Sequence, residues 1–254
     1  MRASAIVVAA GEGRRMRCGE PKPYVLLAGR PILLRTLDRI FAARTVADVV
    51  VVVAPGRIER CRALLQADPA IGGRSWTLAE GGSTRQESVR RGLERIPPDR
   101  DIVLIHDGAR PLVPPALVDA CAEAAYRHGA AVPGVPARDT IKVVTPDGRV
   151  QSTLERDALR EVQTPQAFRY SLILEGHRRA LSEDFQGTDD AVLVERMGEP
   201  VVVIEGDRSN IKITLPEDLA VAEALLGPGP KAWDGSEPRS GSRSDSPGGR
   251  GSRT

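Results

Sequence analysis

The order of apolar and polar positions along the chain predicts strands that alternate with helices. Uninterrupted apolar runs, which are typical of strands covered on both faces, occupy residues 4–10, 49–54 and 102–105. Apolar residues recur at roughly helical spacing over about 31–44, 57–68 and 84–95. This alternation predicts an α/β fold in which helices flank a mostly parallel sheet with right-handed crossovers.

The second half of the chain continues this pattern and then changes in composition. Further elements are expected at about 115–128 (helix), 130–133 (strand), 201–205 (strand) and 216–226 (helix). From residue 227 onward, seven Gly, six Ser and four Pro occupy 17 of 28 positions. Such a segment has too little apolar surface to fold, so we expect one folded domain at 1–226 and a disordered tail at 227–254.

One segment in the second half has a different pattern. Two short β-patterned runs, 140–144 and 149–154, flank the turn sequence Pro146-Asp147-Gly148. A hairpin by itself buries little apolar surface. We therefore expect a projecting β-hairpin arm at about 138–155 that packs on a partner or covers a site.

Composition and charge exclude several classes of protein. The chain of 254 residues has a net charge of +2, but the tail holds five basic and three acidic residues, which leaves 31 of each in residues 1–226. With no basic excess and eight aromatic residues, nucleic-acid binding is not expected. No apolar run is long enough to span a membrane. Three widely spaced cysteines indicate reduced thiols in a cytoplasmic protein.

Two glycine-containing turns stand out, and the first is a candidate for phosphate binding. The first strand leads into a loop that runs from Ala9 to Met16, with Lys22 a few residues later. Glycines let a backbone approach a phosphate closely, and nearby cations neutralise it. Taken alone, this loop is more typical of an ordinary strand-to-helix turn with solvated arginines. The second turn, 81–88, opens a helix, and its simplest interpretation is capping by Ser83 or Thr84.

Asp107 is a candidate ligand-binding residue because it follows a buried strand. Carboxyl ends of such strands lie at the edge where open α/β sheets bind ligands. Asp107 could orient Mg²⁺ or a substrate hydroxyl, and Arg110 could bind an anion. The alternative, equally weighted at this point, is an aspartate that caps the next turn and pairs with Arg110.

Eight motifs occur in one order along the chain: AAGEGRRM followed by PK, GGSTRQESV, HDGARP, RDTIK, TLER, QTPQAF, TDDA and NIKIT. Together they resemble the 2-C-methyl-D-erythritol 4-phosphate cytidylyltransferases of the non-mevalonate isoprenoid pathway. The resemblance covers about residues 3–226 and implies a Rossmann-like fold. The implied reaction joins CTP and the sugar-alcohol phosphate, giving the CDP-linked methylerythritol and pyrophosphate. A phosphate attacking phosphorus in line needs positioning and charge neutralisation rather than a protein nucleophile.

The resemblance also implies roles for individual residues. Transition-state stabilisation and acceptor positioning are expected of Arg15, Lys22, Arg156 and Lys212. Nucleotide contacts are expected of Ala9, Ala10, Gly11, Gly13, Gly82, Ser83 and Ser88. The acceptor site is expected to be lined by Asp107, Arg110, Thr140 and Thr164.

The resemblance further implies a homodimer in which the hairpin arm reaches into the partner's site. Mg²⁺ is expected as cofactor, carried mainly by the CTP phosphates without a dedicated protein metal site. A related pentitol-phosphate enzyme, the ribitol 5-phosphate cytidylyltransferase, remains the alternative within enzymes. A non-catalytic nucleotide-binding regulator is a further alternative, which the presence of both Arg15 and Lys22 disfavours.

Overall fold

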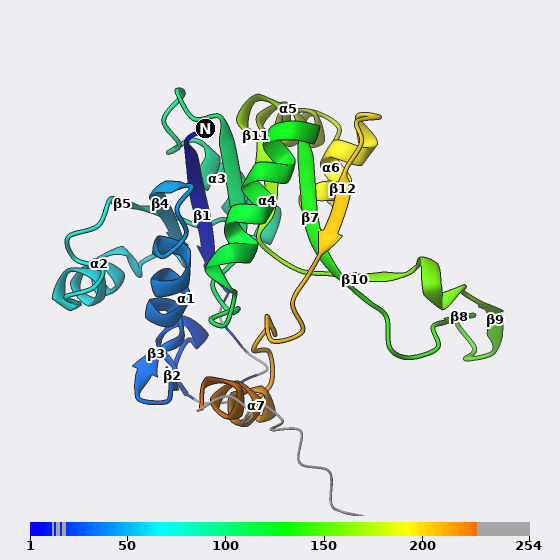
Figure 1. The fold of residues 1–254 in the computed structure, drawn as a ribbon, viewed down its shortest axis with the longest axis horizontal. Coiled ribbons are helices and arrows are strands. Elements are labelled where there is room, and N and C mark those ends of the chain that lie inside the picture. The colour runs from blue at the N-terminus through cyan, green and yellow to red at the C-terminus, as the bar shows by residue number, and fades with distance from the viewer. Residues whose placement is uncertain (12, 14–15, 17–18, 228–254) are drawn as a thin grey trace, which may run out of the picture.

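An eight-stranded sheet runs through the centre of the computed structural model, which describes residues 1–11, 13, 16 and 19–227 (Figure 1). The strand order is β10-β7-β11-β6-β1-β4-β5, and β12 also pairs with β7. The strands are β1 (Ala3–Ala9), β4 (Val46–Val53), β5 (Trp76–Glu80), β6 (Ile102–Asp107), β7 (Ala130–Pro136), β10 (Arg160–Val162), β11 (Gln166–Arg169) and β12 (Val202–Glu205). The tail predicted at 227–254 lies almost wholly outside the described residues.

The sheet is mostly parallel, as predicted, with two exceptions. β1 lies parallel between β4 and β6, and β5 continues the parallel order beyond β4. β10 and β11 run antiparallel to β7, and β11 is also antiparallel to β6. The chain leaves β7 at its carboxyl end and re-enters the sheet from that same end, so the returning strands must run in the opposite direction. The sequence analysis did not predict β5, β10 or β11.

Helices cover both faces of the sheet. The bounds are α1 (Ile32–Phe41), α2 (Ile58–Ala67), α3 (Arg85–Leu93), α4 (Pro115–His128), α5 (Tyr170–Ser182), α6 (Ala191–Arg196) and α7 (Glu217–Leu226). Alternate residues of β1 enter two separate cores: Ala5 and Val7 pack with α1, α2 and α4, whereas Ile6 packs with α3, α5 and α6. This two-sided burial explains the uninterrupted apolar runs. Four of the five helices expected from periodicity lie on the sheet, and α5 and α6 were not predicted.

The fifth expected helix, α7, lies away from the sheet and closes a third apolar cluster. This cluster joins Ala222 of α7 to Leu27, Ile32 and Ile213. Leu27 belongs to a two-stranded ribbon of β2 (Leu26–Leu27) and β3 (Arg30–Pro31), which follows the short helix η2 (Lys22–Tyr24). The packing brings the segments around η2 and Ile213, far apart in sequence, to one end of the molecule.

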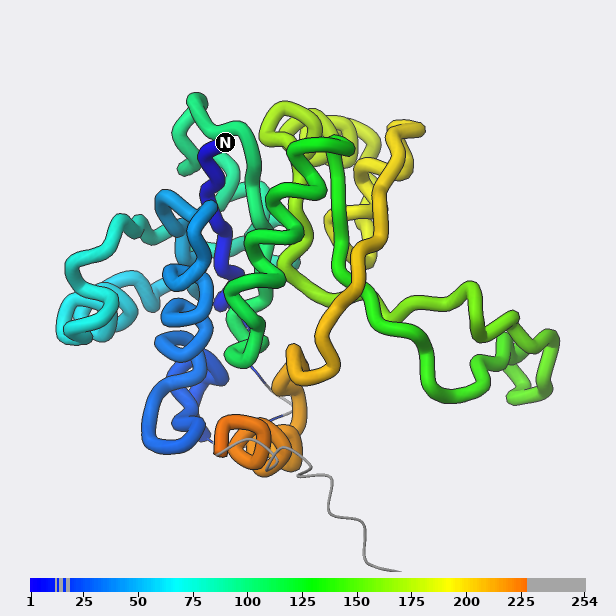
Figure 2. The backbone as a smooth tube through the Cα atoms, in the orientation of Figure 1, coloured from blue at the N-terminus to red at the C-terminus, as the bar shows by residue number. Residues whose placement is uncertain are grey.

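The predicted hairpin arm is formed by β8 (Lys142–Val144) and β9 (Val150–Thr153), which pair antiparallel. Figures 1 and 2 show the arm standing away from the rest of the chain, with η3 (Arg156–Ala158) on its return path. Almost every side chain between Arg138 and Val162 is exposed. The exposed apolar residues on the arm are Ile141, Val143, Val144, Val150 and Leu154.

Cys61 and Cys121 are buried free thiols, as the odd and widely spaced cysteines predict. Burial raises the pKa of both to about 12, which keeps them protonated and unreactive at neutral pH. Cys18 lies outside the described residues. Within the described part of the chain, no helix has the length and apolar character needed to cross a bilayer.

Candidate active site

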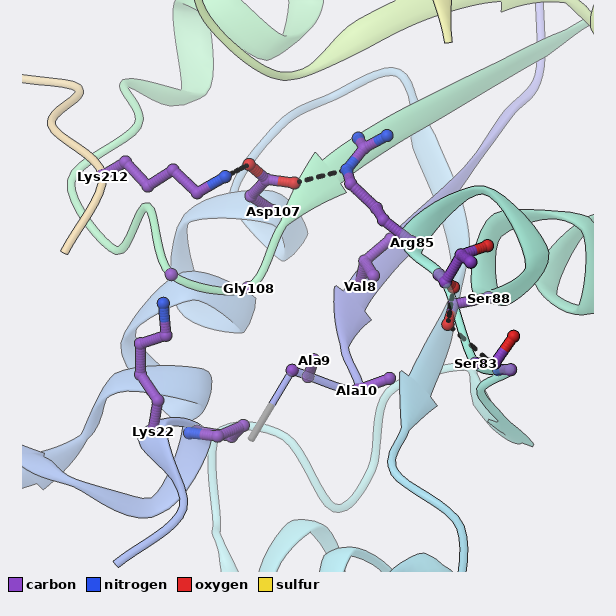
Figure 3. Close-up of a pocket in the computed structure, with 15 residues that line it drawn as sticks. Val8, Ala9, Ala10, Lys22, Ser83, Arg85, Ser88, Asp107, Gly108 and Lys212 are labelled. Carbon is purple, nitrogen blue, oxygen red and sulfur yellow. Dashed lines mark hydrogen bonds and ion pairs between the residues drawn. The ribbon is translucent and has the colours of Figure 1, made fainter. Parts of the chain in front are cut away.

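A pocket of about 230 Å³ opens where β1 and β6 end, at the carboxyl edge expected for an open α/β sheet (Figure 3). Its lining comes from the first glycine loop, the second glycine turn, the end of β6 and the segment before α7. Nine of the predicted site residues contribute: Ala9, Ala10, Gly11, Lys22, Gly82, Ser83, Ser88, Asp107 and Lys212. The structure therefore brings the predicted phosphate loop, the second glycine turn and the predicted aspartate into one site.

The first glycine loop passes close to the residue that supplies one of the pocket's cations. Gly13 has φ +65°, and a Cβ there would lie 2.6 Å from the Cβ of Lys22, so this position requires glycine. Lys22 begins η2, and its Nζ donates a hydrogen bond of 3.1 Å to the carbonyl of Ile213. Lys22 is thereby tied to the segment that carries Lys212. Arg15, predicted to act with Lys22, lies outside the described residues.

The second glycine turn is held against the first. A Cβ on Gly81 would lie 2.5 Å from the Cβ of Ala10, so glycine permits the two loops to approach. The Ser88 hydroxyl accepts from the Gly82 N–H at 3.0 Å and donates to the Thr84 carbonyl at 2.8 Å. The predicted capping is present as well, since the Thr84 side chain accepts from the Glu87 N–H. Capping and pocket formation are therefore two functions of one turn.

The same turn orders Ser83 at the rim of the pocket. The Glu87 carboxylate accepts hydrogen bonds from the Ser83 N–H at 2.7 Å and from its hydroxyl at 2.9 Å. The bond from the Ser83 backbone, followed by those from the Ser83 hydroxyl and Arg91, lowers the pKa of Glu87 to about 2. Glu87 is thus ionised at neutral pH and keeps this backbone in a single arrangement.

Asp107 lies between two cations (Figure 3). Its Oδ1 is 3.1 Å from Arg85 Nε and its Oδ2 is 2.6 Å from Lys212 Nζ. Burial alone would raise the pKa of Asp107, but Arg85, Lys212 and Arg110 hold it well below its usual range. The Asp107 N–H donates to the Thr164 hydroxyl at 3.1 Å. Thr164, predicted to line the acceptor site, thus lies one layer behind the pocket and orients Asp107.

The proposed pairing of Asp107 with Arg110 is wrong in detail. Arg110 instead donates from Nη1 to the Asn210 carbonyl at 2.6 Å, and its Nε is buried without a hydrogen-bond partner among the described residues. Arg110 and Lys212 both line a second cavity of about 390 Å³ beside the first. Two cations that line this junction indicate a site for an anion.

Arg85 is the charged residue of the described pocket lining that the sequence analysis did not name as a site residue. It contacts both Asp107 and Asp190, and the attraction of these two carboxylates outweighs burial and raises its pKa. The position of Arg85 could have indicated its importance from the sequence. It is the first residue of α3, where the helix dipole disfavours a cation. A charge placed there against the dipole indicates a partner elsewhere in the fold.

Thr140 and Arg156 are not among the residues that line either cavity of their own chain. Thr140 lies at the start of the arm and Arg156 begins η3, and both are exposed. Figure 2 shows the arm standing out to one side of the rest of the chain. The structure therefore does not place these two predicted site residues at the pocket of their own chain.

His106 lies directly behind the pocket and is fully buried. Its Nε2 is 3.1 Å from the Arg110 carbonyl and its Nδ1 is 3.1 Å from the Thr164 hydroxyl. Burial lowers its pKa to about 4. The imidazole is therefore neutral at physiological pH and bridges Arg110 and Thr164 as a hydrogen-bonding spacer.

The free energy of unfolding is expected to decrease as the pH falls, because His106 is buried in its neutral form. An unfolded histidine binds its proton near pH 6.5, whereas folded His106 does so only near pH 4, so the unfolded state holds more protons between these values. The loss accumulates from about pH 6.5 to about pH 4 and reaches on the order of 3 kcal/mol. In urea unfolding at several pH values, His106→Gln should lack this component. The matched variant His128→Gln, on the exposed end of α4, should retain it, and equal pH dependence in all three proteins would contradict the prediction.

The architecture suits an enzyme that acts on nucleotide phosphates. Glycine turns after the strands, lysines from two segments and one oriented carboxylate surround a pocket at the carboxyl edge of the sheet. Such a site can bind a polyphosphate through backbone N–H groups and neutralise charge on its phosphorus. The fold and this pocket together define a nucleotidyltransferase of the α/β class.

The chain belongs to the 2-C-methyl-D-erythritol 4-phosphate cytidylyltransferase family, whose model matches residues 3–228. An enzyme of that name from Pelotomaculum thermopropionicum is 46% identical over 224 residues, covering 88% of this chain and 93% of that protein. Another, from Syntrophotalea carbinolica, is 47% identical over 223 residues, covering 87% and 94%.

Solved structures agree with this membership. The 4-diphosphocytidyl-2C-methyl-D-erythritol synthase of Anaerococcus prevotii superposes with a TM-score of 0.79 at 32% identity, over 89% of this chain and 96% of that one. The 2-C-methyl-D-erythritol 4-phosphate cytidylyltransferase of Thermus thermophilus gives a TM-score of 0.72 at 39% identity, over 89% and 98%. The resemblance stated from eight motifs is therefore confirmed.

Proposed function

We propose that this protein transfers the cytidylyl group of CTP to 2-C-methyl-D-erythritol 4-phosphate, giving 4-diphosphocytidyl-2-C-methyl-D-erythritol and pyrophosphate in isoprenoid precursor biosynthesis. The identity of the substrates is inferred from the family to which the chain belongs. The observation that carries the proposal is that Lys22, Lys212 and Asp107, from three distant segments, line one pocket beside the glycine loops. A non-catalytic regulator would have no need for this convergence of cations.

In the proposed reaction, an oxygen of the acceptor phosphate attacks the α-phosphorus of CTP and pyrophosphate leaves on the opposite side. Negative charge accumulates on the phosphorus oxygens and on the leaving group in the transition state. Lys22, together with Arg15, is proposed to neutralise this charge. The backbone of Ala9, Ala10 and Gly11 would cradle the phosphates, and the turn of Gly82, Ser83 and Ser88 would hold the ribose and cytosine.

The acceptor is proposed to bind at the junction of the two cavities. Lys212 lines both of them and is oriented by Asp107, while Arg110 lines the second. A phosphate monoester at this junction would carry the negative charge that the two cations can pair with. His106 and Thr164 support this wall from behind through the Arg110 carbonyl and the Asp107 N–H.

We propose that the site is completed by the arm of a second copy of the chain, in a homodimer. Five exposed apolar residues on a two-stranded hairpin are a strong reason to expect a partner, because an isolated hairpin is marginally stable in water. The arm would bring Thr140 and Arg156 to the partner's acceptor. This arrangement accounts for their exposure and their distance from the pocket of their own chain.

Mg²⁺ is proposed as the cofactor, bound mainly through the triphosphate of CTP. Among the described residues no group of three acidic, histidine or cysteine side chains is arranged to hold a metal, and Asp107 is the one carboxylate in the described pocket lining. Mg²⁺ commonly binds through substrate phosphates and one or two carboxylates, so these residues fit an ion that arrives with the nucleotide.

The reduced state of Cys61 and Cys121 supports a cytoplasmic location.

The substrate assignment is tested by a pyrophosphate-release assay with CTP and two acceptors. We expect turnover with 2-C-methyl-D-erythritol 4-phosphate and, under the same conditions, a value of kcat/KM at least about 100-fold lower with ribitol 5-phosphate, because the branched acceptor must fill its pocket to be positioned. ATP in place of CTP is the matched control for the nucleotide. Preference for ribitol 5-phosphate would replace the proposed acceptor, and no turnover with either would reject the function.

A further inference from the structure

A continuous chain of paired side chains runs from the pocket into the core behind α3. Lys212 pairs with Asp107 Oδ2 and Arg85 Nε with Asp107 Oδ1 (Figure 3). Arg85 continues the chain through Nη1, which lies 2.6 Å from Asp190 Oδ2. Asp190 Oδ1 in turn lies 3.2 Å from His177 Nε2. The five residues come from five different elements or segments of the fold.

The inner end of this chain is immobilised. Asp190 and His177 are almost completely buried. The side-chain oxygen of Gln166, on β11, accepts hydrogen bonds from the N–H groups of Asp190 at 3.0 Å and Ala191 at 3.2 Å. A buried carboxylate held in this way needs a cationic partner, and Arg85 supplies it.

At the outer end of the chain the Lys212 side chain is less constrained than the buried pair. Lys212 lies in a segment without helix or strand between β12 and α7, and its side chain is 41% exposed. A lysine side chain is a flexible stem that carries a point charge, so its ammonium group needs an anchor to stay in one place. Asp107 is that anchor, and Arg85 holds the other oxygen of the Asp107 carboxylate.

We propose that Arg85 is a positioning residue: by bridging Asp190 and Asp107 with two arms of one guanidinium, it holds Asp107 so that Lys212 faces the acceptor phosphate. The inference rests on the proposed function for the identity of that acceptor. The planar fork of arginine suits two carboxylates at once, whereas lysine offers a single point charge. Arg85 acts through Asp107 and Lys212 and does not touch the reacting atoms.

Steady-state kinetics separate this role from direct nucleotide binding. In Arg85→Gln we expect KM for the acceptor to rise by on the order of ten- to hundred-fold, because a displaced Lys212 ammonium group no longer positions the acceptor phosphate. KM for CTP should change less than about twofold. Arg85→Lys should recover part of the loss. The matched control Arg90→Gln, on the same helix and paired with the exposed Glu94, should behave as wild type. A rise in KM for CTP alone would overturn the positioning role.

A second readout needs no substrate. The chain has four lysines, so protein labelled with ¹³Cε-lysine gives four lysine signals, and the Lys212 signal is identified by its loss in Lys212→Arg. We expect this signal to shift in Arg85→Gln and in Asp107→Asn but not in Arg90→Gln, and the Lys142 signal from the arm to stay constant. An unshifted Lys212 signal in a folded Arg85→Gln protein would overturn the proposal.

A double variant tests whether Asp190 acts through Arg85. Asp190→Asn should shift the Lys212 signal in the same direction as Arg85→Gln, and adding it to Arg85→Gln should produce little further change. Additive shifts would show that the two residues act independently and would overturn the bridge. If Arg85→Gln fails to fold, Arg85→Lys with and without Asp190→Asn carries the same comparison. If the wild-type protein were inactive with both acceptors, the proposed function would be rejected. The spectroscopic result would still test whether Arg85 bridges Asp190 and Asp107.

Discussion

Lys22→Ala is expected to lower kcat by roughly 100- to 1,000-fold with little change in thermal stability, because an electrostatic group that acts on the transition state contributes on this scale. Lys22 lines the pocket directly behind the glycine loop, and its Nζ is held near the Lys212 segment through the Ile213 carbonyl. Truncation removes a cation but leaves the apolar cluster of Leu27, Ile32 and Ile213 intact. The check is pyrophosphate release at saturating substrates together with a melting curve.

The scarcity of lysine provides a clean control for this variant. Lys231→Ala changes one of the four lysines at a position beyond the family match at residues 3–228 and should keep wild-type turnover. A Lys22→Ala enzyme with normal kcat would remove the residue from the mechanism. A large fall in melting temperature would instead assign it a structural role.

Mixing two inactive variants should restore activity if the arm completes the partner's site. Lys22→Ala damages the body of a subunit, whereas Arg156→Ala damages only its arm, so a mixed dimer contains one intact site built from an undamaged body and an undamaged arm. Equal amounts that exchange freely should recover about a quarter of wild-type activity, since half of the dimers are mixed and one of their two sites is intact. The measurement is turnover before and after denaturation and refolding of the mixture.

The matched control for the mixing experiment is Lys22→Ala with Lys212→Ala. Both residues line the same pocket of one chain, so every site in this mixture lacks one of them. No recovery is therefore expected. Recovery in both mixtures would point to an effect other than arm exchange, and recovery in neither would argue against shared sites.

Several elements were predictable because their local pattern is strong. α4 has the predicted bounds, Pro115–His128, since a proline opens it and Gly129, with φ +97°, ends it. β1, β4 and β6 were found from uninterrupted apolar runs that both layers of helices require. The hairpin was found from its Pro-Asp-Gly turn.

The elements that were missed depend on neighbours rather than on their own pattern. β11 has four residues, Gln166–Arg169, and becomes a strand because β6 and β7 lie on either side of it. Its Gln166 is a polar residue buried to hold Asp190, which breaks the apolar run that a central strand normally shows. β10 pairs with β7 alone and is exposed along its length.

Some residues of the candidate site could likewise be predicted from the sequence, and others could not. Asp107 could be named from its place at the end of a buried strand, whereas the residues of the two glycine turns were named from the order of the family's motifs, because the turns taken alone carry a weak signal. The partners of Asp107 could not be named. Sequence proximity favoured Arg110, which lies three residues away, but the carboxylate pairs with Arg85 and Lys212, 22 residues before it and 105 residues after it.

The sequence by itself determined the alternating architecture, the arm, the family and most of the groups that surround the pocket. Strand burial, turn chemistry and motif order can each be recognised from short contiguous segments and their order along the chain. Only the tertiary structure decided which charges meet. Ion pairs depend on distances between segments that the fold brings together, and a buried carboxylate takes whichever cations the packing places within reach. The bridge from Lys212 through Asp107 and Arg85 to Asp190 exists because β6, α3, the start of α6 and the segment before α7 converge at one edge of the sheet.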